Sequence, residues 1–308
     1  MATLQLVTNS NNRPPRPAPQ QLSWKLPTYS PTALNQYRSC PEAFLHERLL
    51  RTPAIDNQSR GALIKGTATH VLLDRYIALG STDRIQFEAD VARQSEQALI
   101  AEGMPTTDPG FLDAAAQVES WVTNGLHTLQ NTYDSALLLI GEQFLDLRWV
   151  RDSEPFRLTA KIDLLALFPD GSVESLDWKT GSSRSPDRLQ NVVCRLVAEA
   201  NASKIFATHL STRQPTAIRT TVFHLDSQTL TSQEFTRSQL IAEFSNIRAQ
   251  ISRIERAKAT PVAGTPDWRA QPGPLCSWCK YQHACSHISR PPTDEIMSWL
   301  DEDAGLST

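Results

Sequence analysis

The sequence predicts an α/β fold in which a mixed sheet is flanked by helices, with helical additions before the sheet and a cysteine-rich segment after it. Apolar residues recur at helical spacing through residues 31–132, and short apolar runs bounded by turn residues fill residues 137–179. A helical stretch, an extended stretch and a second helical stretch then follow. A chain of 308 residues with 40% hydrophobic content can also bury a substantial core.

The first helix is expected to begin after Ser30, an N-cap residue that is followed by Pro31 in the first turn. The Cys40-Pro41 step predicts a break or a new start, because proline cannot donate to a preceding helical turn. Further helices are expected over 66–79, 83–103, 109–132, 188–204 and 232–258, the last of them ended by Pro261 and Gly264.

Three consecutive strands are expected to form a meander. They cover 137–150, 156–168 and 172–179, and the turns RDSEP and PDG join them. A further strand is expected over 215–225.

One folded domain, over 26–288, is expected between two tails. Residues 1–25 are rich in Asn, Gln and Pro, so they cannot bury much surface and are expected to be disordered. Residues 289–308 form an acidic tail with five acidic residues and no Lys or Arg after position 290, which we expect to be solvated.

The composition sets limits on location and partners. No apolar run approaches the roughly 18 residues that read as a membrane span, and the start of the chain lacks a signal-peptide pattern. We therefore expect a cytoplasmic protein without a membrane partner. The net charge of −3 argues neither for nor against a nucleic-acid partner.

Three charged residues, Asp163, Asp177 and Lys179, lie on two of the expected strands. Asp177 and Lys179 point to one face, because residues two apart on a strand do so, and Trp178 points to the other. Each charge alone is best explained as exposed or adjacent to a turn. Together they are costly to bury unless paired or metal-bound, and two carboxylates suit Mg²⁺ or Mn²⁺. Lys179 can then orient or help to deprotonate a water and offset phosphate charge.

Three other residues are weaker candidates for the same centre. His70, in the helix expected over 66–79, is a candidate third ligand, although a single helical histidine is more often packed or exposed. Glu142 is a weaker candidate still. Gln190 opens the helix after Lys179 and can reach a metal-bound water or a substrate phosphate, but a solvated helix residue explains it equally well.

The cysteines form a pattern split between the two ends of the chain. Cys276, Cys279 and Cys285 follow C-x₂-C-x₅-C, and Cys40 lies far upstream. Three clustered thiols need a fourth ligand to complete a zinc site or a four-iron cluster, and Cys40 is the candidate. Cys194 lies on an apolar helix face and is expected in the core.

The spacing leaves the identity of this second metal open. Zinc sites usually pair two close-spaced cysteine knuckles. This chain has only one, which favours an iron–sulfur cluster. His283 and His287 keep a mixed zinc site in consideration. In either case the metal would join the first helices to the end of the chain.

Taken together, these residues resemble the RecB-like nucleases of the PD-(D/E)XK superfamily over residues 28–287. The matching motifs are SPT at 30–32 with Cys40-Pro41 and Phe44, the helical Gly66-x-x-x-His70, Ile162-Asp163, Leu176-Asp177-Trp178-Lys179-Thr180-Gly181, and Gln190. The four split cysteines resemble the iron–sulfur staple of AddB-type and CRISPR-associated RecB-like exonucleases. Two positions depart from the family pattern: Ala160 stands where Gly is common, and Cys194 where Tyr is common.

The resemblance implies a restriction-endonuclease-like core that hydrolyses DNA phosphodiesters, with exonuclease action on single-stranded ends. The implied catalytic residues are His70, Asp163, Asp177, Lys179 and Gln190, with Mg²⁺ or Mn²⁺ on His70, Asp163, Asp177 and the backbone carbonyl of Trp178. It also implies a mainly structural [4Fe–4S] cluster on Cys40, Cys276, Cys279 and Cys285. A helicase, CRISPR or repair protein is the implied protein partner, since this chain has no phosphate-binding loop motif of its own.

Two other classes of protein explain parts of the sequence. A catalytically inactive nucleic-acid-binding module stapled by zinc accounts for the cysteines, but the complete Asp/Asp/Lys set favours an enzyme. An iron–sulfur redox protein leaves that set unexplained, and the chain has no flavin or nicotinamide motif. The favoured prediction is a metal-dependent DNA nuclease with a structural cluster.

Overall fold

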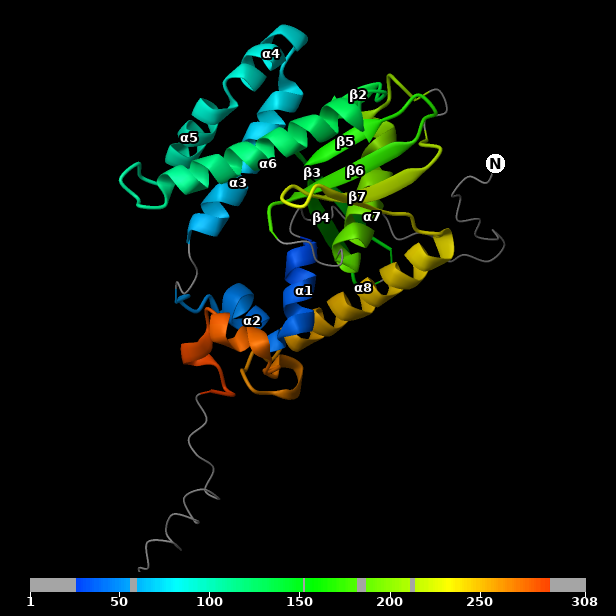
Figure 1. Cartoon of the computed structure of the whole chain (residues 1–308). Helices are drawn as coiled ribbons and strands as arrows, with labels where there is room; N and C mark the ends of the chain where they lie inside the picture. Colours follow the sequence, from blue (N-terminus) through cyan, green and yellow to red (C-terminus); the bar gives the residue numbers. More distant parts are fainter. Residues whose placement is uncertain (1–25, 56–59, 152, 182–186, 211–213, 289–308) are drawn as a thin grey trace, which may run out of the picture.

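The computed structural model describes residues 26–55, 60–151, 153–181, 187–210 and 214–288. The tails expected at 1–25 and 289–308 lie outside these ranges. Within them, two mixed sheets are flanked by helices, as the sequence predicts (Figure 1). None of the helices in the described part of the chain has the length and apolar character needed to cross a bilayer.

A three-stranded and a five-stranded sheet form the centre of the fold. In the first, β4 (Phe156–Ile162) lies between β1 (Thr28–Tyr29), to which it is parallel, and β3 (Gln143–Trp149), to which it is antiparallel. The second sheet has the order β2 (Leu138–Ile140), β5 (Leu164–Leu167), β6 (Val173–Lys179), β7 (Ile218–His224) and β8 (Thr229–Gln233). Strands β6 and β7 run parallel, and the other neighbours run antiparallel.

The helices begin where capping residues predict. Helix α1 (Pro31–Ser39) starts after Ser30, whose Oγ accepts the Ala33 N–H, and α2 (Pro41–Leu45) starts after Cys40. The remaining helical elements are η1 (His46–Leu50), α3 (Arg60–Ala78), α4 (Ser81–Ala89), α5 (Val91–Ala101), α6 (Phe111–Asn131), α7 (Arg188–Ile205), α8 (Arg237–Ala257), η2 (Pro266–Trp268), η3 (Pro274–Trp278) and η4 (Gln282–Ala284).

Three of the helix predictions are wrong in detail. The helix expected over 66–79 already begins at Arg60. Residues 83–103 form α4 and α5 rather than one helix, because the backbone at Asp90 leaves the helical region. The last long helix begins at Arg237 rather than near 232, because Thr236 and Gln239 form a reciprocal capping box. The residues just before it pair with β7 as β8, a strand that the sequence analysis missed.

Two of the expected strands are also wrong, because each is divided between the two sheets. The strand expected over 137–150 divides at Gly141 and Glu142, and the strand expected over 156–168 divides at Asp163. Helix α3 lies very close here: Asp74 Oδ1 accepts the Glu142 backbone N–H at 2.6 Å, and a Cβ added to Gly141 would lie 2.1 Å from the same oxygen. Asp163 therefore occupies a bend between two strands rather than the interior of one.

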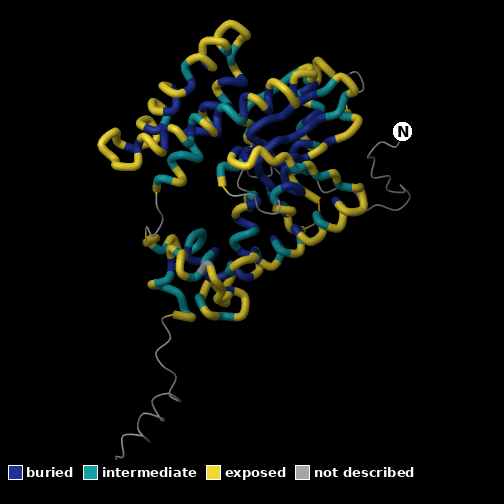
Figure 2. The backbone as a smooth tube through the Cα atoms, viewed as in Figure 1, coloured by how far each residue is buried: buried dark blue, intermediate teal, exposed yellow. Residues whose placement is uncertain are grey.

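Helices cover the five-stranded sheet from both sides (Figure 1). Helices α7, α8 and α1 bury one apolar cluster, which includes Val192 and Ile247. Helices α3, α5 and α6 bury a second cluster, which includes Leu73 and Val118. Figure 2 shows that buried residues run through the strands, whereas exposed residues lie on the outer turns of the helices.

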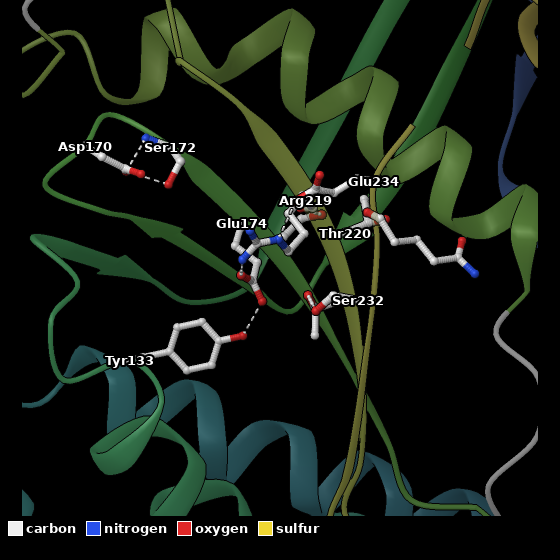
Figure 3. A network of polar contacts seen from close by, with 11 residues as sticks. Tyr133, Asp170, Ser172, Glu174, Arg219, Thr220, Ser232 and Glu234 are labelled. Carbon is white, nitrogen blue, oxygen red and sulfur yellow. Dashed lines mark hydrogen bonds and ion pairs between the residues drawn. The ribbon is translucent and has the colours of Figure 1, made fainter. Parts of the chain in front are cut away.

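A polar network pairs β6 with β7 near the start of both strands. Glu174 and Arg219 are register partners, and Arg219 Nη1 donates to Glu174 Oε2 at 3.4 Å. Tyr133, just after α6, donates its hydroxyl to Glu174 Oε1 at 2.7 Å (Figure 3). Arg219 Nε donates to Glu234 at 3.1 Å. The Glu174 carboxylate, which is 6% exposed, is thus paired at both oxygens.

The close crossing of α3 and α6 generates a stability prediction. A Cβ added to Gly125 on α6 would lie 2.5 Å from Leu73 Cδ2 on α3, and the Leu73 side chain is fully buried, so it can shift only by repacking its neighbours. We expect Gly125→Ala to lower the free energy of unfolding by about 1–3 kcal/mol. Urea denaturation measures it. Gly61→Ala is the matched helical control, since its new methyl group would make an ordinary 3.7 Å contact; equal loss in both variants would contradict the prediction.

Candidate active site

Two carboxylates meet where β5 pairs with β6. Leu164 pairs with Leu176, which places Asp163 and Asp177 next to each other on antiparallel strands. The backbone N–H of Trp178 donates to Asp163 Oδ2 at 2.9 Å, and only 8% of Asp163 is exposed. The bend that separates the two sheets therefore directs Asp163 toward β6.

Lys179 and Gln190 complete the surroundings of Asp177. Lys179 Nζ forms an ion pair with Asp177 Oδ2 at 2.7 Å, and Gln190 Nε2 donates to Asp177 Oδ1 at 2.7 Å. Lys179 Nζ also donates to Gln190 Oε1 at 3.4 Å. Asp187 caps α7 by accepting the Gln190 backbone N–H at 3.1 Å, which holds Gln190 in the first turn of the helix.

One oxygen of Asp177 has unused capacity. Oδ2 is buried and, apart from the ion pair with Lys179, accepts no aligned hydrogen bond. Burial raises the pKa of the Asp177 carboxyl; the Lys179 ammonium opposes this shift and the Asp163 charge reinforces it. A divalent cation at this oxygen would stabilise the charged form, so the carboxylate pair fits a metal chemically.

His70 reaches the centre from α3. Its Nδ1 lies 3.2 Å from Asp163 Oδ1, and a quarter of its side chain is exposed. Burial alone would lower the pKa of His70. The hydrogen bond and charge of Asp163, together with the charge of Asp177, outweigh burial and raise this pKa above its usual 6.5.

Glu174 shows what distinguishes Asp177 from a structural carboxylate on the same strand. Both side chains are largely buried on β6. Glu174 accepts a hydrogen bond on each oxygen from Tyr133 and Arg219 (Figure 3). Asp177 pairs with Lys179 and Gln190, but a second acid, Asp163, lies beside it. The two acids differ in this like-charged neighbour, which favours a bound cation at Asp177.

The other residues considered in the sequence occupy less central positions. Glu142, just before β3, forms an ion pair with Lys161 on β4. Cys194 is buried in the cluster under α7, as expected. Burial, followed by the charges of Asp177 and Asp163, raises the pKa of its thiol to about 12, so this thiol stays protonated near the carboxylate pair.

The four split cysteines come together in one place. Cys40, Cys276, Cys279 and Cys285 all line a single cavity of about 380 Å³ between α2 and the end of the described chain. Burial raises the pKa of the Cys279 thiol; a backbone hydrogen bond from Tyr281 opposes this, and the other three thiols reinforce it. The N–H groups of Ala43 and Gly273 donate to the sulfurs of Cys40 and Cys276 at 3.5 and 3.3 Å.

A buried glutamate ties the same two segments together without a metal, and the sequence analysis missed it. Glu42, which is 1% exposed, accepts from the backbone N–H of Ser286 at 2.5 Å and from its hydroxyl at 2.6 Å. His46 Nε2 lies 3.6 Å from the same carboxylate, and its ring stacks on Tyr281 at 5.9 Å. A glutamate directly after Cys40-Pro41 reads as an ordinary first-turn acid, so only the tertiary contact identifies it.

No set of three or more His, Cys, Asp or Glu side chains in the described ranges is spaced to hold a single metal ion. Asp163 and Asp177 instead contact His70, Lys179 and Gln190. The four thiols line one cavity together with other residues, among them Pro272, Pro274 and His287.

Comparison with known proteins agrees with this arrangement. The family model for the PD-(D/E)XK nuclease superfamily matches residues 28–286. This match covers most of the chain and includes both the carboxylate pair and the four split cysteines. The chain belongs to the PD-(D/E)XK nuclease superfamily.

Two solved structures are similar to the chain at low sequence identity. One is a protein from Eubacterium rectale described provisionally as an exonuclease, with 11% identity, a TM-score of 0.46, and coverage of 87% of this chain and 92% of the other. The second is SSO0001, with 12% identity, a TM-score of 0.31, and coverage of 74% and 98%. A search of curated proteins finds no match.

The His70–Asp163 contact predicts a measurable titration. In the metal-free protein we expect the His70 pKa to lie above 6.5, and Asp163→Asn to lower it, because burial then acts without the opposing carboxylate. The pair's contribution to stability is accordingly present below pH 6.5 and lost as the pH rises through the folded-state pKa. NMR titration of the imidazole measures both. The control variant Glu174→Gln should leave the His70 pKa unchanged. A His70 pKa at or below 6.5 in the wild type would contradict the pairing of His70 with Asp163.

Proposed function

We propose that the protein is a metal-dependent DNA nuclease acting through the centre formed by Asp163, Asp177 and Lys179. The observation that carries this proposal is the adjacency of two largely buried carboxylates beside a partly exposed lysine. Membership of the PD-(D/E)XK nuclease superfamily supports phosphodiester hydrolysis as the reaction.

Mg²⁺ or Mn²⁺ would be held by Asp163 and Asp177, with His70 and the Trp178 carbonyl as further ligands. When bound, the cation supplies Lewis-acid activation of the phosphate and of the attacking water. His70 and the Trp178 N–H hold Asp163 in orientation. Lys179 is placed to orient the water and to offset negative charge on the phosphate, and Gln190 positions both Lys179 and Asp177.

We propose DNA as the substrate and cleavage from single-stranded ends as the mode of action. Both rest on the motif resemblance to RecB-like exonucleases. A helicase or another repair or CRISPR protein would supply such ends, because this chain carries no nucleotide-binding loop with which to unwind DNA.

We also propose that the four-cysteine cavity holds a [4Fe–4S] cluster with a structural role, zinc being the alternative. The clustering of four thiols around a cavity of about 380 Å³ supports the larger group. The N–H groups directed at two of the sulfurs suit thiolate ligands, whose negative charge they stabilise. Glu42 adds a metal-independent tie between the same segments.

The nuclease proposal predicts that Lys179→Ala and Asp163→Asn each lower Mn²⁺-dependent cleavage by at least about 100-fold while the protein stays folded. Loss of Lys179 removes a positive charge from the reacting phosphate, and loss of Asp163 removes a metal ligand. Cleavage of end-labelled single-stranded DNA by anaerobically purified protein measures the effect, and circular dichroism checks folding.

Asp170→Asn is the matched control, because this acid accepts from Ser172 in the turn between β5 and β6, at the opposite end of these strands from the centre. Full activity in both centre variants would refute the assignment. Covalently closed circular single-stranded DNA separates the two modes of action: an exonuclease leaves it intact, whereas cleavage of the circle would identify an endonuclease.

The cluster proposal predicts a brown, air-sensitive protein that contains iron and acid-labile sulfide. Cys279→Ser should bleach it, because the cluster loses one of its four thiolate ligands. Cys194→Ser, which changes a buried cysteine outside the cavity, should stay brown. Metal analysis and the visible spectrum measure both variants; a colourless wild type with stoichiometric zinc would contradict the cluster and favour the zinc site.

A further inference from the structure

A cavity between α1 and α8 has no part in the mechanism above. Its volume is about 400 Å³, and its walls come from α1, the start of α2, α8 and the segment after η2. Of the described residues that line it, only Arg38 on α1 and Arg253 on α8 carry a charge, and none is acidic. Both arginines are exposed, so the cavity opens to solvent and a ligand can reach them.

The arginine on α1 is held in position with part of its guanidinium group left free. Arg38 Nε donates to Gln250 Oε1 at 2.8 Å, and Gln250 Nε2 donates to the Leu34 carbonyl at 2.7 Å. Within the described part of the chain, the two terminal amino groups of Arg38 have no hydrogen-bond partner or ion pair. A planar guanidinium group fixed at Nε presents these two donors as a fork, which suits the oxygens of a phosphate.

The arginine on α8 lines the same cavity and is also unpaired. Arg253 has no hydrogen bond or ion pair with another described residue. Burial raises the pKa of the Tyr37 hydroxyl; the Arg253 charge opposes this shift and the Asp267 charge reinforces it. The Arg253 charge is therefore close to α1. Asp267 lies near the same hydroxyl but is not one of the residues that line the cavity.

The acids of α8 do not neutralise these arginines. This helix carries four arginines and two acids, and both acids are paired elsewhere. Glu243 forms an ion pair with Arg188 at 2.6 Å, and Glu255 forms one with Lys258 at 2.6 Å. Positive charge therefore remains at the cavity and favours an anionic ligand. Two guanidinium groups on walls from different helices can together bind the oxygens of one phosphate.

The cavity lies close to the candidate active site. Helix α1 lies beside α8 below the sheet (Figure 1). Asn35 of α1 donates to Asp187, the cap of α7, and Arg38 follows three residues later on the same side of α1, about 4.5 Å along its axis. The first turn of α7 holds Gln190, which contacts Asp177. A DNA strand that passes the start of α7 on leaving the carboxylate pair can therefore reach the cavity.

We propose that this cavity binds a backbone phosphate of the DNA strand, away from the scissile phosphate, between the guanidinium groups of Arg38 and Arg253. The inference rests on the proposed nuclease function and adds a second phosphate site to it. A contact to phosphate carries no base specificity, so the site holds a strand of any sequence while one of its phosphodiesters lies at the carboxylate pair. Loss of either arginine should weaken DNA binding more than the chemical step.

The first test measures binding of single-stranded DNA by Arg38→Gln, by Arg253→Gln and by the double variant, with Ca²⁺ in place of Mn²⁺ to prevent cleavage. We expect each single variant to raise Kd about tenfold, the loss typical of one hydrogen bond to a charged group. In the double variant the slope of log Kd against log salt should fall by about 0.7, because one phosphate contact is lost. With Mn²⁺, KM should rise and kcat should stay nearly unchanged.

Arg237→Gln is the matched control, because it removes the same charge from an exposed arginine of α8 outside the cavity. It should leave Kd and the salt slope nearly unchanged. Arg38→Lys tests the fork: it keeps the charge but loses the planar pair of donors, so it should recover only part of the affinity. Circular dichroism checks that each variant is folded.

The second test locates the phosphate. Oligonucleotides with one neutral methylphosphonate at each successive position are bound to the wild type and to the double variant with Ca²⁺. At one position away from the cleavage site, we expect the methylphosphonate to weaken wild-type binding about tenfold but to have little further effect on the variant, since both changes remove the same contact.

Equal weakening in Arg237→Gln would overturn the phosphate site, because the effect would then be one of overall charge. Equal methylphosphonate penalties in both proteins at every position would overturn it as well. A wild type that cleaves DNA, together with arginine variants of unchanged Kd, rejects this inference and leaves the nuclease function standing. A wild type that binds DNA through both arginines without cleaving it rejects only the nuclease function, and one that neither binds nor cleaves DNA rejects both.

Discussion

Two acidic side chains held side by side in a mostly apolar sheet are the constraint on which the candidate site depends. Desolvation and mutual repulsion disfavour two charges at this separation. The fold offsets part of that cost locally: the Trp178 N–H and His70 contact Asp163, and Lys179 and Gln190 contact Asp177. The remaining repulsion between the two carboxylates is what a bound cation would offset in the proposed mechanism. The remaining helices and strands hold these few contacts in place.

The cysteine-lined cavity is mechanically connected to this centre. Helix α2 directly follows α1, and Asn35 of α1 donates to Asp187, the residue that caps α7. The same cap holds the backbone N–H of Gln190, whose side chain contacts Asp177. A change at the cysteine segment therefore has a short path of direct contacts to the carboxylates.

Much of the fold was predictable because its elements follow local rules. The start of α1 after Ser30 follows from capping, and the strand-turn-strand pattern that ends at Lys179 follows from periodicity and turn residues. The errors have two kinds of cause. The strand expected over 137–150 divides where Asp74 of α3 lies against Gly141, and β8 forms because β7 offers it a partner; such tertiary contacts leave no periodic signal in the strand itself. Two of the three helix errors are local, since they come from the backbone at Asp90 and from the capping box of Thr236 and Gln239.

The sequence alone determined the types of chemical group, their order along the chain and the grouping of the last three cysteines, because these follow from residue identity and spacing. Only the tertiary structure decided the partners of each buried acid. Glu174 and Asp177 lie three residues apart on one strand, yet Tyr133 and Arg219 pair with the first, whereas Lys179 and Gln190 pair with the second and Asp163 lies beside it. Glu42 likewise pairs with Ser286, which is far from it along the chain. Burial and partners, rather than residue type, set the energy of a charged or polar group, and both come from distant parts of the chain.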